Sequence, residues 1–201
     1  MLTVVGMGPA GLQWLIPAAR EAIAAAEALV GGSRHLQQFP DFAGERFALG
    51  ADMPALLAWI EARTGRRVVV LASGDPLFYG IGTRLIAHFG RERVQVIPGI
   101  SAVQYLCARA GIDMNDMWLT SSHGRAVSFD AMAAHRKVAM VTDGRCGPRE
   151  IAAQLMARGK GHRWMVIGEN LAMENERIHW LPVSAVEDEY EMNAVVILDE
   201  R

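Results

Sequence analysis

The chain has 201 residues, of which 51% are hydrophobic and 21% charged, and its formal net charge is −2 at pH 7. This length supports one large domain or two small ones with a real hydrophobic core, and the composition excludes a disordered protein. The chain has neither a basic excess for nucleic acid nor an acidic tail, which argues against a partner recognised by strong opposite charge.

The amino-terminal stretch resembles a signal peptide only in its lack of charge, since the first charged side chain is Arg20. It has no Lys or Arg in an n-region, and glycines and prolines interrupt its apolar run. The chain also contains no uninterrupted apolar run of about 18 residues that could span a membrane. Cys107 and Cys146 fit neither a disulfide framework nor a zinc ligand set. We therefore expect a cytoplasmic protein in a reducing compartment, without a membrane or nucleic-acid partner.

In the first half of the chain, short β-rich runs alternate with helical patterns. Pro17 suits the first turn of a helix, and Asp52 and Ser101 are expected N-caps. The repeated order of strand, turn and helix indicates a mostly parallel sheet flanked by helices. Strands are predicted at residues 2–7, 28–30, 68–71 and 94–97, and helices at 17–29, 52–63, 81–89 and 101–110.

After Gly111 the pattern changes to a Met/Asp/Asn-rich connection, followed by a second set of elements. We expect two domains, an N-terminal α/β domain over residues 1–113 and a C-terminal α/β domain over residues 114–201. In the second, strands are predicted at 117–120, 138–142, 164–168, 177–180 and 194–198, and helices at 129–135 and 148–158.

The run G-M-G-P-A-G at residues 6–11 matches the G-x-G-x-x-G pattern after a predicted strand. A dinucleotide site would need a helix that begins at the glycines and an acidic residue at the end of the second strand. Pro17 falls where that helix interior would be, and the second strand ends in G-G-S. The pattern therefore indicates a tight glycine turn that closes a buried strand.

Two further turns have the same position after a strand. In A-S-G-D-P-L-F-Y-G, residues 72–80, Gly74 allows the backbone to approach a ligand closely, and Asp75 stands where parallel sheets place ligand-binding groups. Asp75 could equally cap a turn or helix, and Phe78 and Tyr79 could equally pack in a core. In P-G-I-S-A, residues 98–102, Ser101 either caps its helix or faces the same site as Asp75.

These motifs, in this order, resemble the tetrapyrrole methylase superfamily: V-G-M-G-P at the start, then A-S-G-D-P-L-F-Y-G, then P-G-I-S-A-V-Q. In the second half, S-S-H-G-R at 121–125, T-D at 142–143, G-E-N-L at 168–171 and E-R-I at 176–178 are similar to the branch that methylates C5 of cobalt-precorrin-7 or precorrin-7 in cobalamin biosynthesis. The resemblance covers essentially the whole chain.

The resemblance implies two α/β domains with a crevice between them, S-adenosylmethionine bound there in a folded pose, and a homodimer. It also implies that a second methylase and decarboxylase acting at C15, fused to this domain in some relatives, is here a separate partner. The implied cofactor contacts are Pro9, Gly74, Asp75, Phe78, Ser101 and Ala102 from the first domain, and Thr142, Gly168, Asn170 and Leu171 from the second.

Methyl transfer from a sulfonium to carbon needs orientation more than a protein nucleophile, because the electron-rich macrocycle attacks. Phe78 and Tyr79 are candidate aromatic faces for the sulfonium, and Tyr79 is also assigned to the substrate side. The polycarboxylate acceptor suits arginine, so His123 and Arg125 are the other candidate substrate contacts, although a solvated loop would also explain them. No residue is singled out as a catalytic base.

The six histidines lack metal-ligand spacing, so no protein-bound metal is expected, and any cobalt would arrive within the substrate. Three alternatives stay open at this point. They are a flavin or nicotinamide oxidoreductase, a related methylase that acts on RNA or a diphthamide precursor, and a non-catalytic partner of another pathway enzyme. The near-neutral charge argues mildly against RNA.

Overall fold

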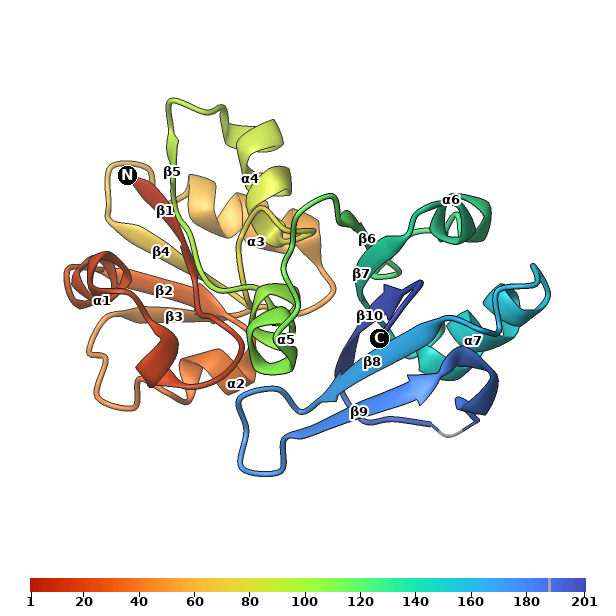
Figure 1. Cartoon of the computed structure of the whole chain (residues 1–201). Helices are drawn as coiled ribbons and strands as arrows, with labels where there is room; N and C mark the ends of the chain where they lie inside the picture. Colours follow the sequence, from red (N-terminus) through yellow and green to blue (C-terminus); the bar gives the residue numbers. More distant parts are fainter. Residues whose placement is uncertain (188) are drawn as a thin grey trace. The chain divides into compact units, whose positions relative to one another are not determined.

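The computed structural model describes residues 1–187 and 189–201. The chain forms two compact units, Met1–Ser101 and Ala102–Arg201. Figure 1 shows that each unit is built on its own sheet with helices beside it. The α/β class expected from the sequence is therefore confirmed.

The first unit is a parallel sheet whose strands alternate with helices along the chain (Figure 1). Its five strands pair in the order β3-β2-β4-β1-β5, and every pair is parallel. The carboxyl ends of β4, β1 and β5 therefore lie next to one another at one edge of the sheet. The elements are β1 (Leu2–Gly6), η1 (Leu12–Trp14), α1 (Pro17–Ala24), β2 (Ala28–Gly31), α2 (Ser33–Leu36), β3 (Glu45–Ala48), α3 (Met53–Glu61), β4 (Val68–Ala72), α4 (Ile81–Phe89) and β5 (Val94–Ile97).

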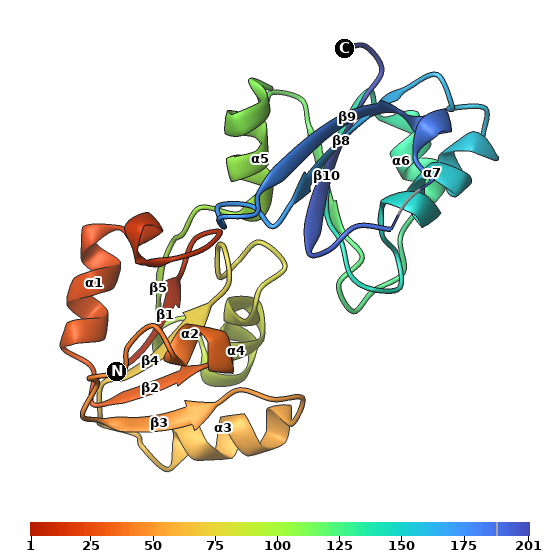
Figure 2. The same ribbon diagram turned by 90° about the horizontal axis from the view of Figure 1, so that it is seen from below.

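Both faces of this sheet are covered by helices. Val4 lies in a core cluster with Leu56 of α3 and Leu85 of α4, whereas the adjacent Val5 lies in a second cluster with Ala19 and Ile23 of α1. Successive strand residues point to opposite faces, so a strand buried on both faces is apolar throughout. Figure 2 shows α1 and α3 on different sides of the strands.

Three features of the first unit differ from the expectation, and the first is the short helix α2, which was not predicted. The helix predicted at 17–29 ends at Ala24, because the chain must enter β2 at Ala28 between β3 and β4. Strand β3 was not predicted, since it is an edge strand whose E-R-F-A residues are mostly exposed and show no apolar pattern. The expected cap at Asp52 is confirmed, because its Oδ1 accepts the N–H of Ala55 at 2.9 Å.

The second unit contains a mixed sheet in the order β6-β7-β10-β8-β9. Only β6 and β7 pair in parallel, and the other three pairs are antiparallel. The expectation of a mostly parallel sheet, made for the first half of the chain, is therefore right. The second sheet is mixed because β10 inserts between β7 and β8 and runs opposite to both. The elements are α5 (Ala102–Ala110), β6 (Trp118–Ser121), α6 (Phe129–Ala134), β7 (Lys137–Val141), α7 (Pro148–Met156), β8 (Trp164–Glu169), β9 (Arg177–Pro182), η2 (Val183–Ala185) and β10 (Asn193–Leu198).

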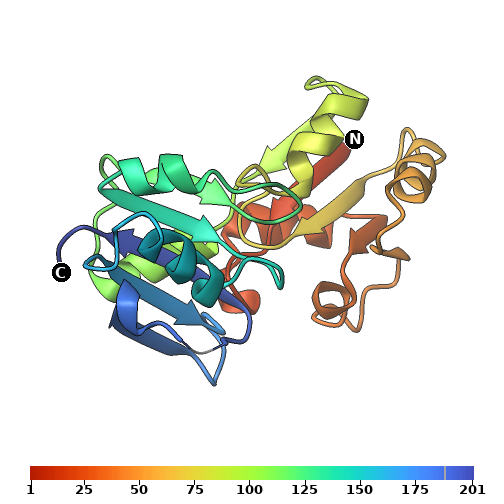
Figure 3. The ribbon, with the colours of Figure 1, turned by 90° about the vertical axis from the view of Figure 1, so that its right-hand side faces the viewer.

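Helix α5 belongs to the second unit by its packing. It lies against β10 and β7, whereas α6 and α7 contribute Met132, Ile151 and Leu155 to the core cluster on the same sheet. Figure 3 shows α6 and α7 together on one side of this sheet. The division between the units consequently falls before α5, at Ser101, whereas the sequence placed it between residues 113 and 114.

One fully buried arginine holds the second unit together at the end of α6. Arg163 donates from its Nη1 to the carbonyl of Met132 at 3.1 Å and from its Nη2 to the carbonyls of His135 and Arg136, each at 2.7 Å. Its Nε lies 2.8 Å from Asp199 Oδ1, an ion pair without hydrogen-bond alignment. The guanidinium therefore satisfies carbonyls that the end of α6 leaves without helical partners.

Candidate active site

Three glycine turns meet at the carboxyl ends of β1, β4 and β5. A Cβ on Gly6 would lie 2.4 Å from the nitrogen of Gly99 and 2.7 Å from the carbonyl oxygen of Gly74. A Cβ on Gly99 would lie 2.3 Å from the same Gly74 oxygen. These neighbours are backbone atoms and cannot move aside as a side chain could, so only glycine permits this approach.

Backbone hydrogen bonds join the first of these turns to the second. The N–H of Gly8 donates to the carbonyl of Gly74 at 3.2 Å, and the N–H of Gly74 donates to the carbonyl of Gly8 at 3.0 Å. Both glycines have positive φ, 73° and 59°. Pro9 follows directly and is half-buried. The G-M-G-P run is thus a strand-closing turn paired with the next loop.

No helix interior follows these glycines. Leu12–Trp14 forms a short 3₁₀ turn, and α1 begins only at Pro17. The geometry that a dinucleotide loop requires, a helix whose first turn contains the glycines, is therefore not formed here, and the interpretation as a glycine turn is correct.

The Asp75 carboxylate joins the second turn to the third. Its Oδ1 accepts the N–H groups of Leu77 at 2.8 Å and Phe78 at 3.1 Å, and its Oδ2 accepts the N–H of Gly99 at 3.2 Å. The turn-capping role that the sequence left open is therefore present. Whether Asp75 also contacts a cofactor stays a prediction, but its side chain shapes both turns that would do so.

Two aromatic side chains follow Asp75. The Phe78 and Tyr79 rings make an edge-to-face contact with centroids 5.1 Å apart, and both residues are half-buried. Tyr79 has a φ of 54°, an uncommon value for a bulky residue. Leu77, which precedes both aromatic residues, is 50% exposed. The loop thus places partly accessible aromatic surface beside the glycine turns.

The third turn ends at the boundary of the first unit. Ser101 is buried with 5% exposure, and Ala102 is the first residue of α5. The first unit therefore brings Gly74, Asp75 and Phe78 together with the turn that leads to Ser101. Their roles as cofactor contacts stay predictions.

In the second unit, the loops that follow β6 and β7 are bonded to each other. Ser122 Oγ accepts the N–H of Asp143 at 2.9 Å and donates to the carbonyl of Cys146 at 3.3 Å. Burial acts to raise the pKa of Asp143, but the backbone N–H groups of Arg145, Cys146 and Gly124 together hold that pKa below its usual value. The loops therefore form a fixed polar edge around a charged carboxylate.

His123 and Arg125 lie on this edge with exposed side chains. The N–H of His123 donates to Ser121 Oγ at 3.0 Å, and that of Arg125 donates to the carbonyl of Ser122 at 3.2 Å. Their backbones are thus held while the side chains face solvent, which suits both a substrate contact and a solvated loop.

Thr142 and the 168–171 stretch lie at the same edge of the second sheet. Because β10 runs antiparallel to both β7 and β8, the carboxyl ends of β7 and β8 flank the start of β10. Thr142 Oγ1 lies 2.7 Å from Asn193 Oδ1 and 2.8 Å from the Asn193 carbonyl. A hydroxyl has one proton, so it donates to one of these at a time.

The 168–171 stretch is buried rather than exposed. Asn170 and Leu171 are 7% and 5% exposed. A Cβ on Gly168 would lie 2.6 Å from Leu171 Cδ2 and 2.7 Å from Leu106 Cδ1, so this glycine lets α5 approach β8. The sequence predicts Gly168, Asn170 and Leu171 as cofactor contacts. The structure shows that Gly168 and Leu171 also pack in the interior of the second unit.

A separate hollow of about 300 Å³ occurs in the first unit. It is lined by residues at the amino ends of β1 and β4, among them Leu2, Val68 and Phe89, together with Arg63 and Arg93. It therefore lies at the opposite end of the sheet from the glycine turns and is not part of the candidate site.

Within residues 1–187 and 189–201, no three His, Cys, Asp or Glu side chains are grouped so that they could hold a metal ion. None of the helices in this part of the chain is long and apolar enough to cross a membrane.

Comparison with known proteins identifies the family. Residues 1–186 match the model of the tetrapyrrole (corrin/porphyrin) methylases. The chain is 79% identical over its full length to the cobalt-precorrin-7 C(5)-methyltransferase of Salmonella typhimurium, and covers 100% of that protein. It is 33% identical to a precorrin-6Y C(5,15)-methyltransferase [decarboxylating] of Sinorhizobium over 88% of this chain and 44% of that one.

A solved structure agrees with this assignment. The precorrin-6Y methylase of Archaeoglobus fulgidus superposes with a TM-score of 0.77 at 25% identity, over 98% of this chain and 97% of that chain. Together with the two sheets and the glycine turns between strand and helix, these matches show that the chain belongs to the tetrapyrrole methylases.

Proposed function

We propose that the chain is an S-adenosylmethionine-dependent C-methyltransferase that methylates C5 of cobalt-precorrin-7 in cobalamin biosynthesis. The single observation that carries this assignment is the 79% identity over the full length of a relative with that activity. The tetrapyrrole methylases use S-adenosylmethionine, so the cofactor follows from the family. An oxidoreductase is not supported, because the glycine turn lacks the helix that a dinucleotide needs.

The loops of the first unit carry hydrogen-bonding groups and aromatic rings that suit this cofactor. S-adenosylmethionine supplies an electrophilic methyl group on a cationic sulfur. Its polar groups need hydrogen bonds, which the fixed backbone of the Gly74 and Gly99 turns and the hydroxyl of Ser101 can provide. The half-buried Phe78 and Tyr79 rings offer aromatic faces toward which a cation is attracted.

We propose that the chain acts mainly by orientation. The macrocycle provides the attacking carbon, so the protein has to align acceptor and donor, an effect worth about 7–11 kcal/mol in well-oriented systems. The Asp75 carboxylate and the glycine contacts fix the first unit's turns before any ligand binds. Thr142, Asn170 and Leu171 are proposed as the second unit's contribution to the cofactor.

We propose His123 and Arg125 as contacts to the acceptor's carboxylates. Both are exposed cationic or potentially cationic side chains on a loop held by backbone bonds. We further propose a cytoplasmic homodimer that works with a separate C15-methylating, decarboxylating enzyme. The free thiols of Cys107 and Cys146 support a reducing compartment.

The decisive experiment incubates the purified chain with a trapped late intermediate of the pathway and labelled S-adenosylmethionine. Mass spectrometry and NMR of the product should show one added methyl group at C5. A product methylated elsewhere would overturn the position, and methyl transfer only to RNA or protein would overturn the substrate.

Substitutions of Arg125 test whether this residue contacts the methyl acceptor. We expect Arg125→Glu to weaken acceptor binding by about a hundredfold, because a bidentate attraction becomes a repulsion. Binding of S-adenosylhomocysteine should change by less than about threefold. Arg125→Lys should be intermediate, since the charge remains without the planar fork.

The matched control is Arg84→Glu, which makes the same charge change at an exposed site on α4. Normal acceptor binding by Arg125→Glu would make Arg125 a solvated loop residue. Loss of S-adenosylhomocysteine binding would instead place the loop at the donor site.

A further inference from the structure

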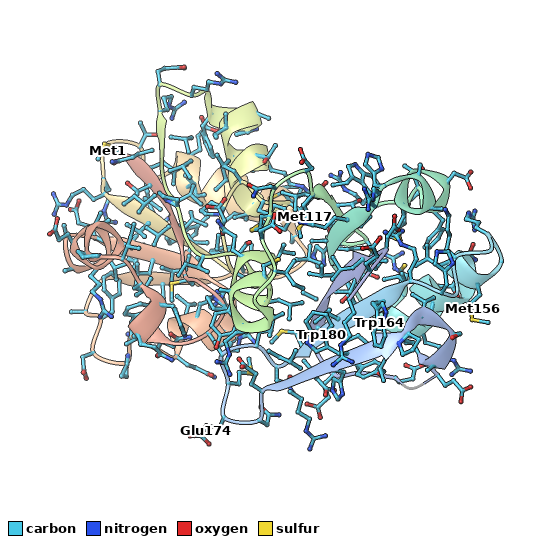
Figure 4. All side chains as sticks on the ribbon, in the orientation of Figure 1. Met1, Met117, Met156, Trp164, Glu174 and Trp180 are labelled. Carbon is cyan, nitrogen blue, oxygen red and sulfur yellow. The ribbon has the colours of Figure 1, made fainter. Side chains whose placement is uncertain are left out.

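The loop between β8 and β9 holds an uncommon backbone conformation. Asn170 and Ala172 both have left-handed φ values, 48° and 64°. Asparagine tolerates this region, but in alanine it is energetically unfavourable because the Cβ comes too close to a carbonyl oxygen. Such a conformation persists only where surrounding contacts determine it, and it is concentrated at ligand-binding segments. Figure 4 labels Glu174 near the tip of this loop, away from the strands.

Glu176 holds the alanine in place. Its Oε2 accepts the N–H of Ala172 at 2.6 Å, and its Oε1 accepts a hydrogen bond from Arg109 Nε at 2.8 Å. The Glu176 side chain is 13% exposed, compared with 56% for Arg109. Burial acts to raise the pKa of Glu176, but the Ala172 N–H, Arg109 and Tyr105 together hold that pKa below its usual value. The carboxylate is therefore charged when it makes these bonds.

A second set of bonds holds the asparagine. Asn170 Nδ2 donates to Glu191 Oε2, and the Asn170 N–H donates to the carbonyl of Met192 at 2.8 Å. The N–H of Glu191 in turn donates to Glu169 Oε1 at 2.7 Å. The loop is thus fixed on one side by the segment before β10 and on the other by Glu176.

The Glu176 contact connects the loop to one particular helix. Arg109 and Tyr105 lie on α5, whose first residue, Ala102, directly follows Ser101. The same helix therefore continues from the third glycine turn of the first unit and carries the partners of Glu176. Two segments are proposed to contact the cofactor. The one that ends at Ser101 continues directly into α5, and the one that begins at Gly168 is linked to α5 through Glu176 and Arg109.

We propose that Glu176 is a positioning residue for methyl transfer. Glu176 accepts hydrogen bonds from the Ala172 N–H and from Arg109 at the same time. It therefore fixes the 170–172 backbone and links it to α5, so the loop is already ordered before the cofactor binds. This inference rests on the proposed function, in which the 168–171 stretch contacts S-adenosylmethionine. Preorganisation of this kind strengthens binding by removing the entropic cost of ordering.

The test compares Glu176→Ala and Glu176→Gln with the intact protein. Glu176→Ala should weaken S-adenosylhomocysteine binding about tenfold and raise the KM for S-adenosylmethionine to match, with kcat at saturating cofactor within about threefold. Glu176→Gln should be intermediate, because its amide oxygen still accepts the Ala172 N–H but lacks charge for Arg109.

The matched control is Asp130→Ala. Asp130 Oδ1 of α6 accepts a hydrogen bond from the Nε of Arg158, which follows α7 in the same unit, at 2.7 Å. It is also a carboxylate paired with an arginine, but its side chain is 90% exposed. Its loss should leave cofactor affinity unchanged. If both variants lower the melting temperature and neither changes affinity, Glu176 is only a structural residue and the proposal is wrong.

A second variant tests the cause. Glycine adopts the left-handed region at no steric cost, so Ala172→Gly in the Glu176→Ala chain should restore at least about a third of the lost affinity. No restoration would show that the affinity lost in Glu176→Ala does not come from the backbone at Ala172, and would overturn the inference that Glu176 acts by fixing that backbone. If the unmodified protein itself fails to bind S-adenosylhomocysteine, the proposed function is overturned. If it binds and Glu176→Ala binds equally well, only this inference is overturned.

Discussion

Asp75 orders two turns of the candidate site, so we expect this one side chain to affect both stability and cofactor binding. Its carboxylate accepts three backbone N–H groups from two turns, those of Leu77, Phe78 and Gly99. Hydrogen bonds to a charged acceptor each contribute about 1.5–3 kcal/mol. A residue in this position orders the site even before a ligand is present.

We therefore expect Asp75→Ala to act on both properties. The free energy of unfolding should fall by at least about 1.5–3 kcal/mol, the contribution of one such bond, because the N–H groups lose a charged acceptor. Affinity for S-adenosylhomocysteine should fall roughly ten- to hundredfold, as the two turns separate. Chemical denaturation and calorimetry measure the two effects. A loss of stability with unchanged affinity would leave Asp75 as a turn cap alone.

At the scale of elements, Arg163 joins the end of α6 to the end of β10 through carbonyls and Asp199. We expect Arg163→Ala to lower the free energy of unfolding by about 3–5 kcal/mol, since it leaves buried polar groups without partners. The control is Arg136→Ala, which removes an 81% exposed partner of the same Asp199 and should cost no more than about 1 kcal/mol. Equal losses in urea denaturation would contradict this account.

The contact between the β1, β4 and β5 turns is also a property of elements. A methyl group at Gly99 would meet Gly74 O at 2.3 Å and Gly6 Cα at 2.7 Å. Gly99→Ala should therefore displace the turns, lower stability by about 1–3 kcal/mol and weaken cofactor binding. Gly50→Ala is the control, because a Cβ there has nothing within 4 Å. Unchanged binding by Gly99→Ala would show that the turn moves without affecting the site.

At the scale of the whole molecule, binding of the cofactor product should stabilise the fold. At a hundred times its Kd, S-adenosylhomocysteine adds about 2.7 kcal/mol to the free energy of unfolding. For a chain of this size that raises Tm by about 5–10 °C. NAD and FAD should leave Tm unchanged, and differential scanning calorimetry compares all three. Stabilisation by a dinucleotide but not by S-adenosylhomocysteine would overturn the cofactor assignment.

Local sequence determined most of the individual elements. The apolar runs of β1, β4 and β8, the proline at the start of α1 and the Asp52 cap of α3 each depend on neighbouring residues, so their patterns are readable in order along the chain. The motifs around the glycine turns and in the second half, in their order along the chain, also resemble the tetrapyrrole methylases, and the comparisons confirm that family.

Only the tertiary structure decided which of these segments meet. β10 lies between β7 and β8 although it comes last in the chain, and no local period encodes a strand's partner or direction. The same is true of the site. The bond from Asp75 to Gly99 and the bonds from Glu176 to Ala172 and Arg109 depend on where whole elements pack. For Asp75 the sequence left both a turn-capping and a ligand-binding role open, and for Glu176 it predicted no contact, so long-range packing chose the partners of both carboxylates.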